Sequence, residues 1–167
     1  MKIAFFEVKE WECGYIRPHF PDFHLYFSGA RLDKHHLPQR RDFDCLSVFI
    51  YSRIDARLLA EFPHVKLIAT RSTGYDPIDT AACRERGIAV AHVPTYGEYT
   101  VAEHTFALIL SLSRNVHKFY WHAVEGRMDL AILTGFDLKD KTLGVVGAGR
   151  IGLHVIKIAR GLLRLRY

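Results

Sequence analysis

A glycine-rich turn near the end of the sequence is the feature that most constrains the fold. An apolar run over 142–146 leads directly into the pattern Gly147-x-Gly149-x-x-Gly152. The residues after this turn are apolar at helical spacing, at Ile151, Val155, Ile158 and Ala159. A strand, a tight glycine turn and a helix, in this order, form the phosphate-binding unit of dinucleotide-binding domains.

Each glycine of this turn has its own physical role in such a unit. Gly147 permits the turn, Gly149 lets a pyrophosphate approach the backbone, and Gly152 lets the helix pack close to the strand. The N–H groups at the start of the helix, near Arg150 and Ile151, face the phosphates, and the helix dipole favours their negative charge. A glycine turn that binds nothing is the alternative, and the correct flanks on both sides favour the nucleotide site.

The composition indicates a soluble, globular chain of one or two small domains. Of the 167 residues, 49% are hydrophobic and 25% are charged, which is enough apolar surface to bury a core. The most apolar segment, 106–112, is too short to span a membrane and predicts a buried helix. Residues 1–6 resemble a first strand rather than a signal peptide, so we expect a cytoplasmic protein that does not bind membranes.

Neither the cysteines, the histidines nor the charge predicts a metal or nucleic-acid site. Cys13, Cys45 and Cys83 are odd in number and widely spaced, so we expect reduced thiols rather than a disulfide framework or a zinc site. The 10 histidines show no HExxH pattern and no paired Cys/His spacing, so no metal is expected. The net charge of +5 is mostly dispersed, and no nucleic-acid-binding motif accompanies it.

Residues 1–99 alternate short apolar runs with helix-like stretches and predict an α/β domain. Such an alternation is typical of a parallel sheet covered on both faces, and a flavodoxin-like domain fits it. The predicted strands are 2–8, 24–28, 45–51, 66–70 and 88–93. The predicted helices are 56–62, which Asp55 could cap, and 79–86, which Gly87 ends. Segment 11–20 is ambiguous because prolines limit any helix there.

From residue 100 to about residue 125 the apolar pattern becomes helical. Its broad apolar stripe consists of Val101, Thr105, Ala107, Leu108, Leu112 and Val116. Such a stripe is usually part of a core, although it can also form an oligomer interface. The polar connection 127–141 then leads into the glycine turn.

Three loops are expected at the carboxyl ends of the strands, where open α/β sheets bind their ligands. They begin at Tyr51 and cover 71–76 and 94–99. The second loop is informative because the small residues of 71–74 offer backbone N–H groups of the kind that bind a carboxylate. A plain strand-to-helix turn is the alternative, and spacing alone favours the plain turn.

Three segments, taken together, carry a specific resemblance. They are 70–79 (TRSTGYDPID), 93–105 (VPTYGEYTVAEHT) and 143–152 (LGVVGAGRIG). In order and spacing they resemble the NAD-dependent D-2-hydroxyacid dehydrogenase family, and within it the D-lactate dehydrogenase-like branch. The resemblance implies a flavodoxin-like substrate domain over 1–99. It implies a linking and dimerisation helix and the incomplete start of a Rossmann NAD-binding domain over 100–167.

The resemblance also implies an activity, in which a small 2-keto acid and its D-2-hydroxy acid are interconverted with NAD. In such enzymes the backbone N–H groups of Thr73 and Gly74 hold the substrate carboxylate, and Tyr51 contacts the substrate. Val101 lies by the nicotinamide, and helix 101–121 forms a homodimer. The residues that match the pyrophosphate turn are Gly147, Gly149, Arg150, Ile151 and Gly152.

The departures from the family are equally informative. The family's catalytic arginine, carboxylate and histidine follow the glycine turn, and no residue of 1–167 matches them, so we nominate no catalytic residue and expect this chain alone to be inactive. The acidic residue that binds the adenosine ribose is expected about 20 residues after the turn, so the preference for NAD over NADP comes only from the family.

Several alternatives stay open at the level of sequence. A non-catalytic truncated paralogue, which binds nucleotide weakly or pairs with a full-length subunit, is the second hypothesis for the function. An early stop, a frameshift near Gly161 and a deliberately shortened chain each account for the lack of strand character over 161–167. The sequence does not select one particular 2-hydroxy acid as the substrate.

Overall fold

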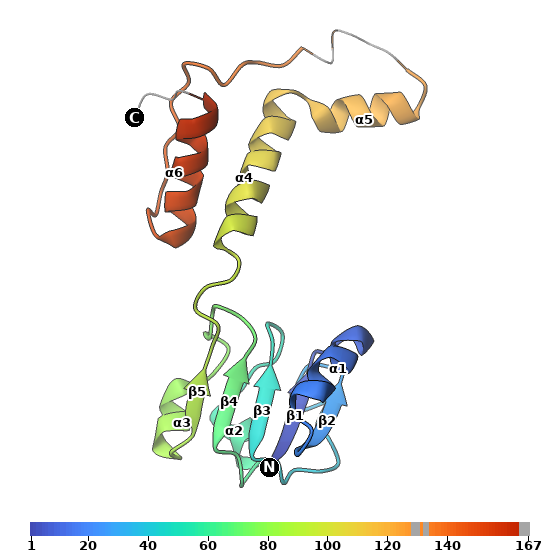
Figure 1. Cartoon of the computed structure of the whole chain (residues 1–167), viewed down its shortest axis with the longest axis vertical. Helices are drawn as coiled ribbons and strands as arrows, with labels where there is room; N and C mark the ends of the chain where they lie inside the picture. The colour runs from blue at the N-terminus through green and yellow to red at the C-terminus, as the bar shows by residue number, and fades with distance from the viewer. Residues whose placement is uncertain (128–130, 132–133, 164–167) are drawn as a thin grey trace. The chain divides into compact units, whose positions relative to one another are not determined.

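The computed structural model describes residues 1–127, 131 and 134–163. The chain divides into two compact units, Met1–Thr95 and Tyr96–Tyr167, and each is considered by itself (Figure 1). The sequence predicted a division after residue 99, which lies inside the first turn of helix α4 (Glu98–Ser113). The first unit ends just before that helix.

The first unit is built on a five-stranded parallel sheet with the strand order β2-β1-β3-β4-β5. Its strands are β1 (Lys2–Phe6), β2 (His24–Ser28), β3 (Cys45–Val48), β4 (Leu67–Thr70) and β5 (Ala89–Ala91). In the register of β1, Ile3 pairs with Leu25 of β2 on one side and with Cys45 of β3 on the other. This is the flavodoxin-like order, and it confirms the predicted fold of this unit.

The five predicted strands are confirmed, and only β2 has the predicted bounds. β1 ends at Phe6 because Glu7 adopts a positive φ of 56°, which an extended strand does not allow. β3 ends at Val48 because the N–H groups of Phe49 and Tyr51 bind the Glu7 carboxylate instead of a neighbouring strand.

The two predicted helices of the first unit are present, and each begins directly after an aspartate that caps its first turn. α2 (Ala56–Ala60) begins after Asp55, whose side chain accepts a hydrogen bond from the Leu58 N–H at 2.8 Å. α3 (Thr80–Glu85) begins after Asp79, which caps the Ala82 N–H at 2.9 Å. Gly87, with φ of +66°, follows the end of α3 as the sequence predicted.

The ambiguous segment 11–20 is helical in the structure. α1 (Glu10–Ile16) continues into the 3-10 turn η1 (Arg17–His19), and Pro18 stands near the start of that turn. The Glu12 carboxylate accepts a hydrogen bond from the Lys9 N–H at 2.7 Å, which satisfies one of the free donors at the helix start.

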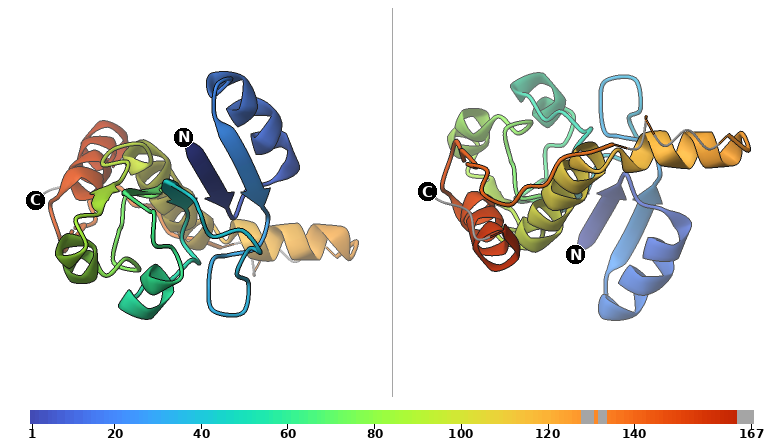
Figure 2. Two further views of the ribbon diagram at one scale, coloured as in Figure 1. Left: turned by 90° about the horizontal axis from the view of Figure 1, so that it is seen from below. Right: turned by 90° about the horizontal axis from the view of Figure 1, so that it is seen from above.

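Helices cover both faces of the sheet, with α1 on one face and α2 and α3 on the other (Figure 2). Alternate residues of β1 therefore enter different cores. Ile3 and Phe5 pack with the α1 side, and Ala4 and Phe6 pack with the larger core on the α2 and α3 side. The larger core contains Leu46, Leu58, Leu59, Phe62, Ile68, Ile78 and Cys83, among others.

The described part of the second unit contains three helices, α4, α5 (Val116–Val124) and α6 (Arg150–Leu163). α4 packs against α6, and the buried residues of this contact are Ala102, Phe106, Val155 and Ala159. Leu143 and Val145 are partly buried against the same core. A short helix pair, rather than a sheet, therefore forms the core of the described part of this unit.

The helix predicted over 100–125 is interrupted at Asn115, which adopts the left-handed conformation with φ of 52°. Asparagine tolerates this conformation better than most residues. The Asn115 side chain donates to the carbonyl of Thr134 at 2.9 Å, and the Phe136 N–H donates to the Ser113 carbonyl at 2.9 Å. The returning chain thus pairs with the end of α4, and a new helix begins after it.

Over 142–146 Thr142 makes a single β-bridge, and no strand forms, although the apolar run predicts one. A strand needs a neighbour that pairs with its backbone N–H and C=O groups, and the described part of this unit contains no strand. The inward and outward alternation is nevertheless present, because Val145 is partly buried whereas Val146 is fully exposed.

The apolar stripe predicted on 100–125 lies on the surface of the described chain. Val101, Leu108, Leu112 and Val116 are 46–65% exposed. The face of α4 that is buried against α6 is instead the one that carries Ala102 and Phe106. Of the two interpretations that the sequence allowed for this stripe, burial in the core of this chain is therefore wrong.

Across the described ranges, no helix is both long and apolar enough to cross a membrane. Within the same ranges, no group of three His, Cys, Asp or Glu side chains is placed to hold a metal ion. All three cysteines are free. The predictions for 161–167 fall, from residue 164 onward, outside the residues that the structure describes.

The burial of the three cysteines predicts a clear order of reactivity. Cys45 and Cys83 are buried, whereas Cys13 is partly exposed. Burial, together with the charge of Asp44, raises the pKa of the Cys45 thiol to about 11, so little reactive thiolate is present at about pH 8. We expect iodoacetamide to alkylate Cys13 first in the folded chain, as measured by peptide mass spectrometry.

The control is the same reaction in guanidinium chloride, where all three cysteines should react at similar rates. Alkylation of Cys45 as fast as that of Cys13 in the folded chain would contradict the described packing.

Candidate functional site

Glu7 organises the loop that carries Tyr51. It follows β1 directly, and its carboxylate accepts hydrogen bonds from the N–H groups of Phe49, Tyr51 and Ser52 at 3.0, 2.7 and 3.0 Å. It also accepts a hydrogen bond from the Ser52 hydroxyl. One carboxylate therefore satisfies the backbone donors that β3 leaves unpaired when it ends. Glu7 was not among the predicted site residues, although an acidic residue directly after an apolar strand was a visible signal.

Arg71 ties the carboxyl ends of three neighbouring strands together. It follows β4, and its guanidinium donates to the Ser47 hydroxyl on β3 at 3.0 Å. It then reaches the carbonyls of Phe6 and Glu7 at the end of β1, at 2.8 and 3.0 Å. Burial lowers the pKa of Arg71, and the negative charges of Glu12 and Glu7 oppose this shift.

The loop after β4 has three of its carbonyls engaged and several of its N–H groups open, among them those of Thr73 and Gly74. The carbonyls of Ser72, Thr73 and Gly74 accept from the Val93 N–H at 3.1 Å, from His92 Nδ1 at 2.8 Å and from the Ser72 hydroxyl at 2.7 Å. Among the residues that the structure describes, the N–H groups of Thr73 and Gly74 have no acceptor. Open, successive N–H groups of this kind bind anions.

The Ser72 side chain is part of a short buried chain of hydroxyl groups. Its oxygen lies 2.6 Å from the Thr70 hydroxyl oxygen, and both residues are buried. Because Ser72 donates its own hydrogen to the Gly74 carbonyl, Thr70 is the donor in the first contact. The hydrogen bond between Thr70 and Ser72 therefore links the loop to the end of β4.

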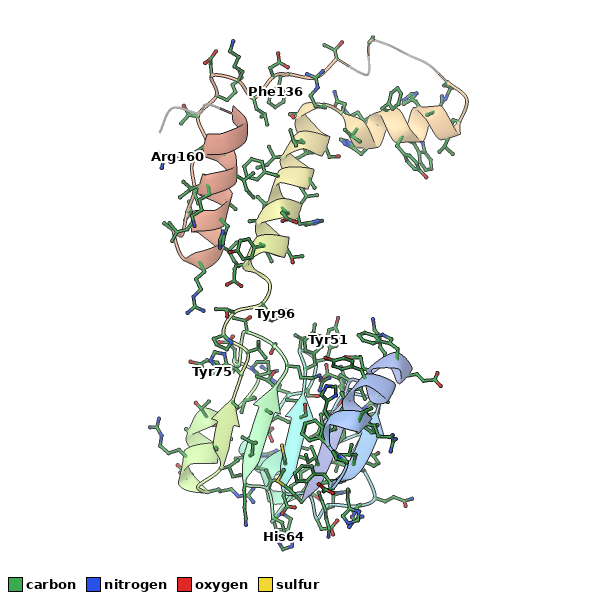
Figure 3. The ribbon with its side chains drawn as sticks, viewed as in Figure 1. Tyr51, His64, Tyr75, Tyr96, Phe136 and Arg160 are labelled. Carbon is green, nitrogen blue, oxygen red and sulfur yellow. The ribbon has the colours of Figure 1, made fainter. Side chains whose placement is uncertain are left out.

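Tyr51 and Tyr75 lie at the same edge of the sheet, where the strand arrows end, whereas His64 lies at the opposite edge (Figure 3). Tyr51 is 70% exposed and lines a cavity of about 640 Å³. The other lining residues include Glu7, Lys9, Trp11, Arg31 and Phe49. Thr73 and Gly74 do not line this cavity, so within this unit the predicted substrate residues occupy one edge but not one cavity.

The glycine turn of the second unit has the geometry that its sequence requires. Gly147 has φ of +91°, which favours glycine. A Cβ atom at Gly152 would lie 2.1 Å from the Gly147 carbonyl oxygen, so α6 approaches the turn too closely for any side chain. A Cβ atom at Gly149 would meet nothing within 4 Å, so the backbone there is open to a ligand. NAD is a group that these residues fit.

The remaining predicted cofactor residues also belong to the second unit. Arg150 and Ile151 are the first residues of α6, and the Leu153 N–H bonds to the Gly149 carbonyl at 2.8 Å. Val101 lies in the first turn of α4 and is 46% exposed. Each unit thus carries its own predicted residues, with the substrate residues in the first and the cofactor residues in the second.

Comparison with known proteins identifies the family. The model of the catalytic domain of D-isomer specific 2-hydroxyacid dehydrogenases matches residues 3–148. The chain belongs to this family. It is 33% identical, over 96% of its length, to a 2-hydroxyacid dehydrogenase homolog of Haemophilus influenzae. It is 30% identical, also over 96% of its length, to the D-lactate dehydrogenase of Escherichia coli.

Solved structures agree with this assignment. The D-lactate dehydrogenase of Aquifex aeolicus, solved in complex with NAD and lactic acid, matches with a TM-score of 0.86 and 31% identity. The match covers 98% of this chain and 50% of the other. The two relatives by sequence are likewise covered over 50% of their own length. This chain therefore spans about half the length of the curated relatives that it matches.

Two glycines of the turn provide a matched pair of variants. We expect Gly152→Ala to destabilise the second unit by about 1–3 kcal/mol because the new methyl group clashes with the Gly147 carbonyl. An alanine inside an ordinary helix would instead be stabilising. We expect Gly149→Ala to leave the packing of α6 unchanged, because its methyl group enters open space.

Hydrogen–deuterium exchange of α6, followed by mass spectrometry, measures both effects. Equal protection of α6 in the Gly152→Ala variant and in the unchanged chain would contradict the close approach.

Proposed function

We propose that this chain provides the substrate-binding domain and the pyrophosphate turn of an NAD-dependent D-2-hydroxyacid dehydrogenase. In this proposal the substrate is a small 2-keto acid, or the D-2-hydroxy acid formed from it, of the D-lactate type. The observation that carries the proposal is the pair of open N–H groups at Thr73 and Gly74, at the carboxyl edge of the sheet. We further propose a cytoplasmic location, which the three free cysteines support.

The chemistry of a 2-keto acid suits this edge of the sheet. Its carboxylate would accept hydrogen bonds from Thr73 and Gly74, while their carbonyls are already engaged and do not repel it. In the proposal the exposed ring of Tyr51 contacts the small group beyond the keto carbon. Three of the five N–H donors of Arg71 are already bound to Ser47, Phe6 and Glu7.

NAD would supply the hydride in this reaction. In the proposal its pyrophosphate binds the turn Gly147–Gly152 at the start of α6, where Gly149 leaves the backbone accessible. Val101 would contact the nicotinamide. Proton transfer is not assigned to any residue of 1–167, because none matches the family's acid–base histidine.

Two measurements test this function. Titration of the ¹⁵N-labelled chain with oxamate, an analogue of pyruvate, should shift the amide resonances of Thr73 and Gly74 more than those of the opposite edge near His64. The chain alone should not oxidise NADH with pyruvate above the rate of a heat-inactivated sample, because it binds but does not move a proton. Unchanged amide resonances at Thr73 and Gly74 would refute the carboxylate site.

A third measurement, turnover by a fusion protein, separates the enzyme from its alternative. A non-catalytic paralogue that pairs with a full-length subunit would also lack turnover alone. It would differ by giving no turnover when residues 1–167 are fused to the remaining half of the A. aeolicus enzyme. Turnover of pyruvate by this fusion would support the dehydrogenase.

We also propose that the chain forms a homodimer through the helical segment 101–121. The apolar side chains of Leu108, Leu112 and Val116 are exposed on it, and so are the aromatic rings of Phe119, Tyr120 and Trp121. A row of exposed apolar residues over two helices is typical of an interface between protein chains.

A charge at the centre of this row tests the dimer. We expect Leu112→Glu to convert a dimer into a monomer, because the interface cannot bury an unpaired carboxylate. Tyr15→Glu is the matched control, since Tyr15 is similarly exposed but lies on α1 of the first unit. Sedimentation velocity gives the mass of each species. A monomeric unchanged chain would refute the interface.

A further inference from the structure

The direction of an N–H group in the loop after β4 is determined by the carbonyl of the same peptide group. In a trans peptide the C=O and N–H bonds point in opposite directions, and the described chain has no cis peptide bond. The carbonyl of Ser72 shares a peptide group with the Thr73 N–H, and the carbonyl of Thr73 shares one with the Gly74 N–H. A donor that holds one of these carbonyls therefore also aims the N–H on the other side.

Two neighbouring residues of the chain after β5 hold these two carbonyls. The Val93 N–H donates to the Ser72 carbonyl at 3.1 Å, and His92 Nδ1 lies 2.8 Å from the Thr73 carbonyl oxygen. A carbonyl can only accept, so His92 Nδ1 carries the hydrogen. The imidazole ring also meets the ring of Tyr75 edge-on, with 5.1 Å between the ring centroids.

The contacts of Val93 and His92 differ in how strongly they depend on the identity of the residue that donates the hydrogen bond. Val93 donates from its backbone, which every residue except proline can supply. His92 donates from its side chain, so its identity determines whether the Thr73 carbonyl has a partner. Gly74 has no Cβ atom to restrict its own backbone, and its peptide group is therefore free to rotate without an outside contact.

We propose that His92 is a positioning residue, which aims the Gly74 N–H at the substrate carboxylate by holding the Thr73 carbonyl. This inference rests on the proposed function, because it needs the carboxylate to bind at Thr73 and Gly74. His92 does not touch the substrate. It lowers the cost of ordering the loop when the carboxylate binds, since the donor already points in the right direction.

Four variants separate the hydrogen bond from the packing of the ring. His92→Asn places its Nδ2 donor the same number of bonds from Cα as His92 Nδ1, so it should restore the contact. His92→Phe keeps a ring beside Tyr75 but has no donor, and His92→Ala removes both. His64→Ala is the control, because His64 lies at the opposite edge of the sheet (Figure 3).

Each variant is made in the 167-residue chain, labelled with ¹⁵N and titrated with oxamate. We expect His92→Phe and His92→Ala to weaken oxamate binding about three- to tenfold, which corresponds to one neutral hydrogen bond. His92→Asn and His64→Ala should bind as the unchanged chain does. Before any ligand is added, His92→Phe should shift the amide resonance of Gly74 more than that of Thr73, whose peptide group is held by Val93.

The outcomes distinguish this inference from the function on which it rests. If oxamate moves neither amide of the unchanged chain, the carboxylate site is absent and both proposals fall. If the unchanged chain and His92→Phe bind oxamate equally well, only the role of His92 falls. A merely structural role would give a different pattern, with His92→Asn as weak as His92→Ala and resonances shifted throughout the unit.

Discussion

The carboxyl edge of the first unit depends on two charged side chains, Arg71 and Glu7, which replace the hydrogen bonds that strand pairing no longer supplies there. Glu7 accepts from the backbone of the Tyr51 loop, and Arg71 donates to β3 and to the last carbonyls of β1. Unpaired backbone groups at such an edge would cost about 1–3 kcal/mol each if they were buried.

As a consequence, some backbone donors and acceptors at this edge have partners within the protein, whereas other N–H groups stay free for a ligand. The N–H groups of Phe49, Tyr51 and Ser52 bind Glu7, and the carbonyls of 72–74 also have partners within the protein. The N–H groups of Thr73 and Gly74 are among those that remain open. A surface prepared in this way favours an anion without a lysine or arginine of its own. In the glycine turn of the second unit, the backbone of Gly152 instead packs directly against the Gly147 carbonyl, so no side chain fits between them.

Local patterns were sufficient to predict most elements. The run 24–28 has its predicted bounds, and Asp55, Asp79 and Gly87 end or begin helices because capping depends on residues nearby in sequence. Predictions failed where a distant partner competes with the local pattern. The apolar residues after Val48 look like a strand, yet their N–H groups bind Glu7, more than 40 residues earlier. The apolar run before Gly147 similarly lacks a neighbouring strand among the described residues.

The amino-acid sequence alone determined the class of the first unit and the glycine turn with its family, because each depends on periodicity or on short motifs. The carboxylate site at Thr73 and Gly74 stays a prediction from the family resemblance. The tertiary structure decided the directions of the groups within these motifs. Glu7, Arg71 and His92 act on segments that are far away in sequence, and no local pattern marks such a pairing. A motif shows which atoms are present, whereas only the folded chain decides which of them are already engaged and which face a ligand.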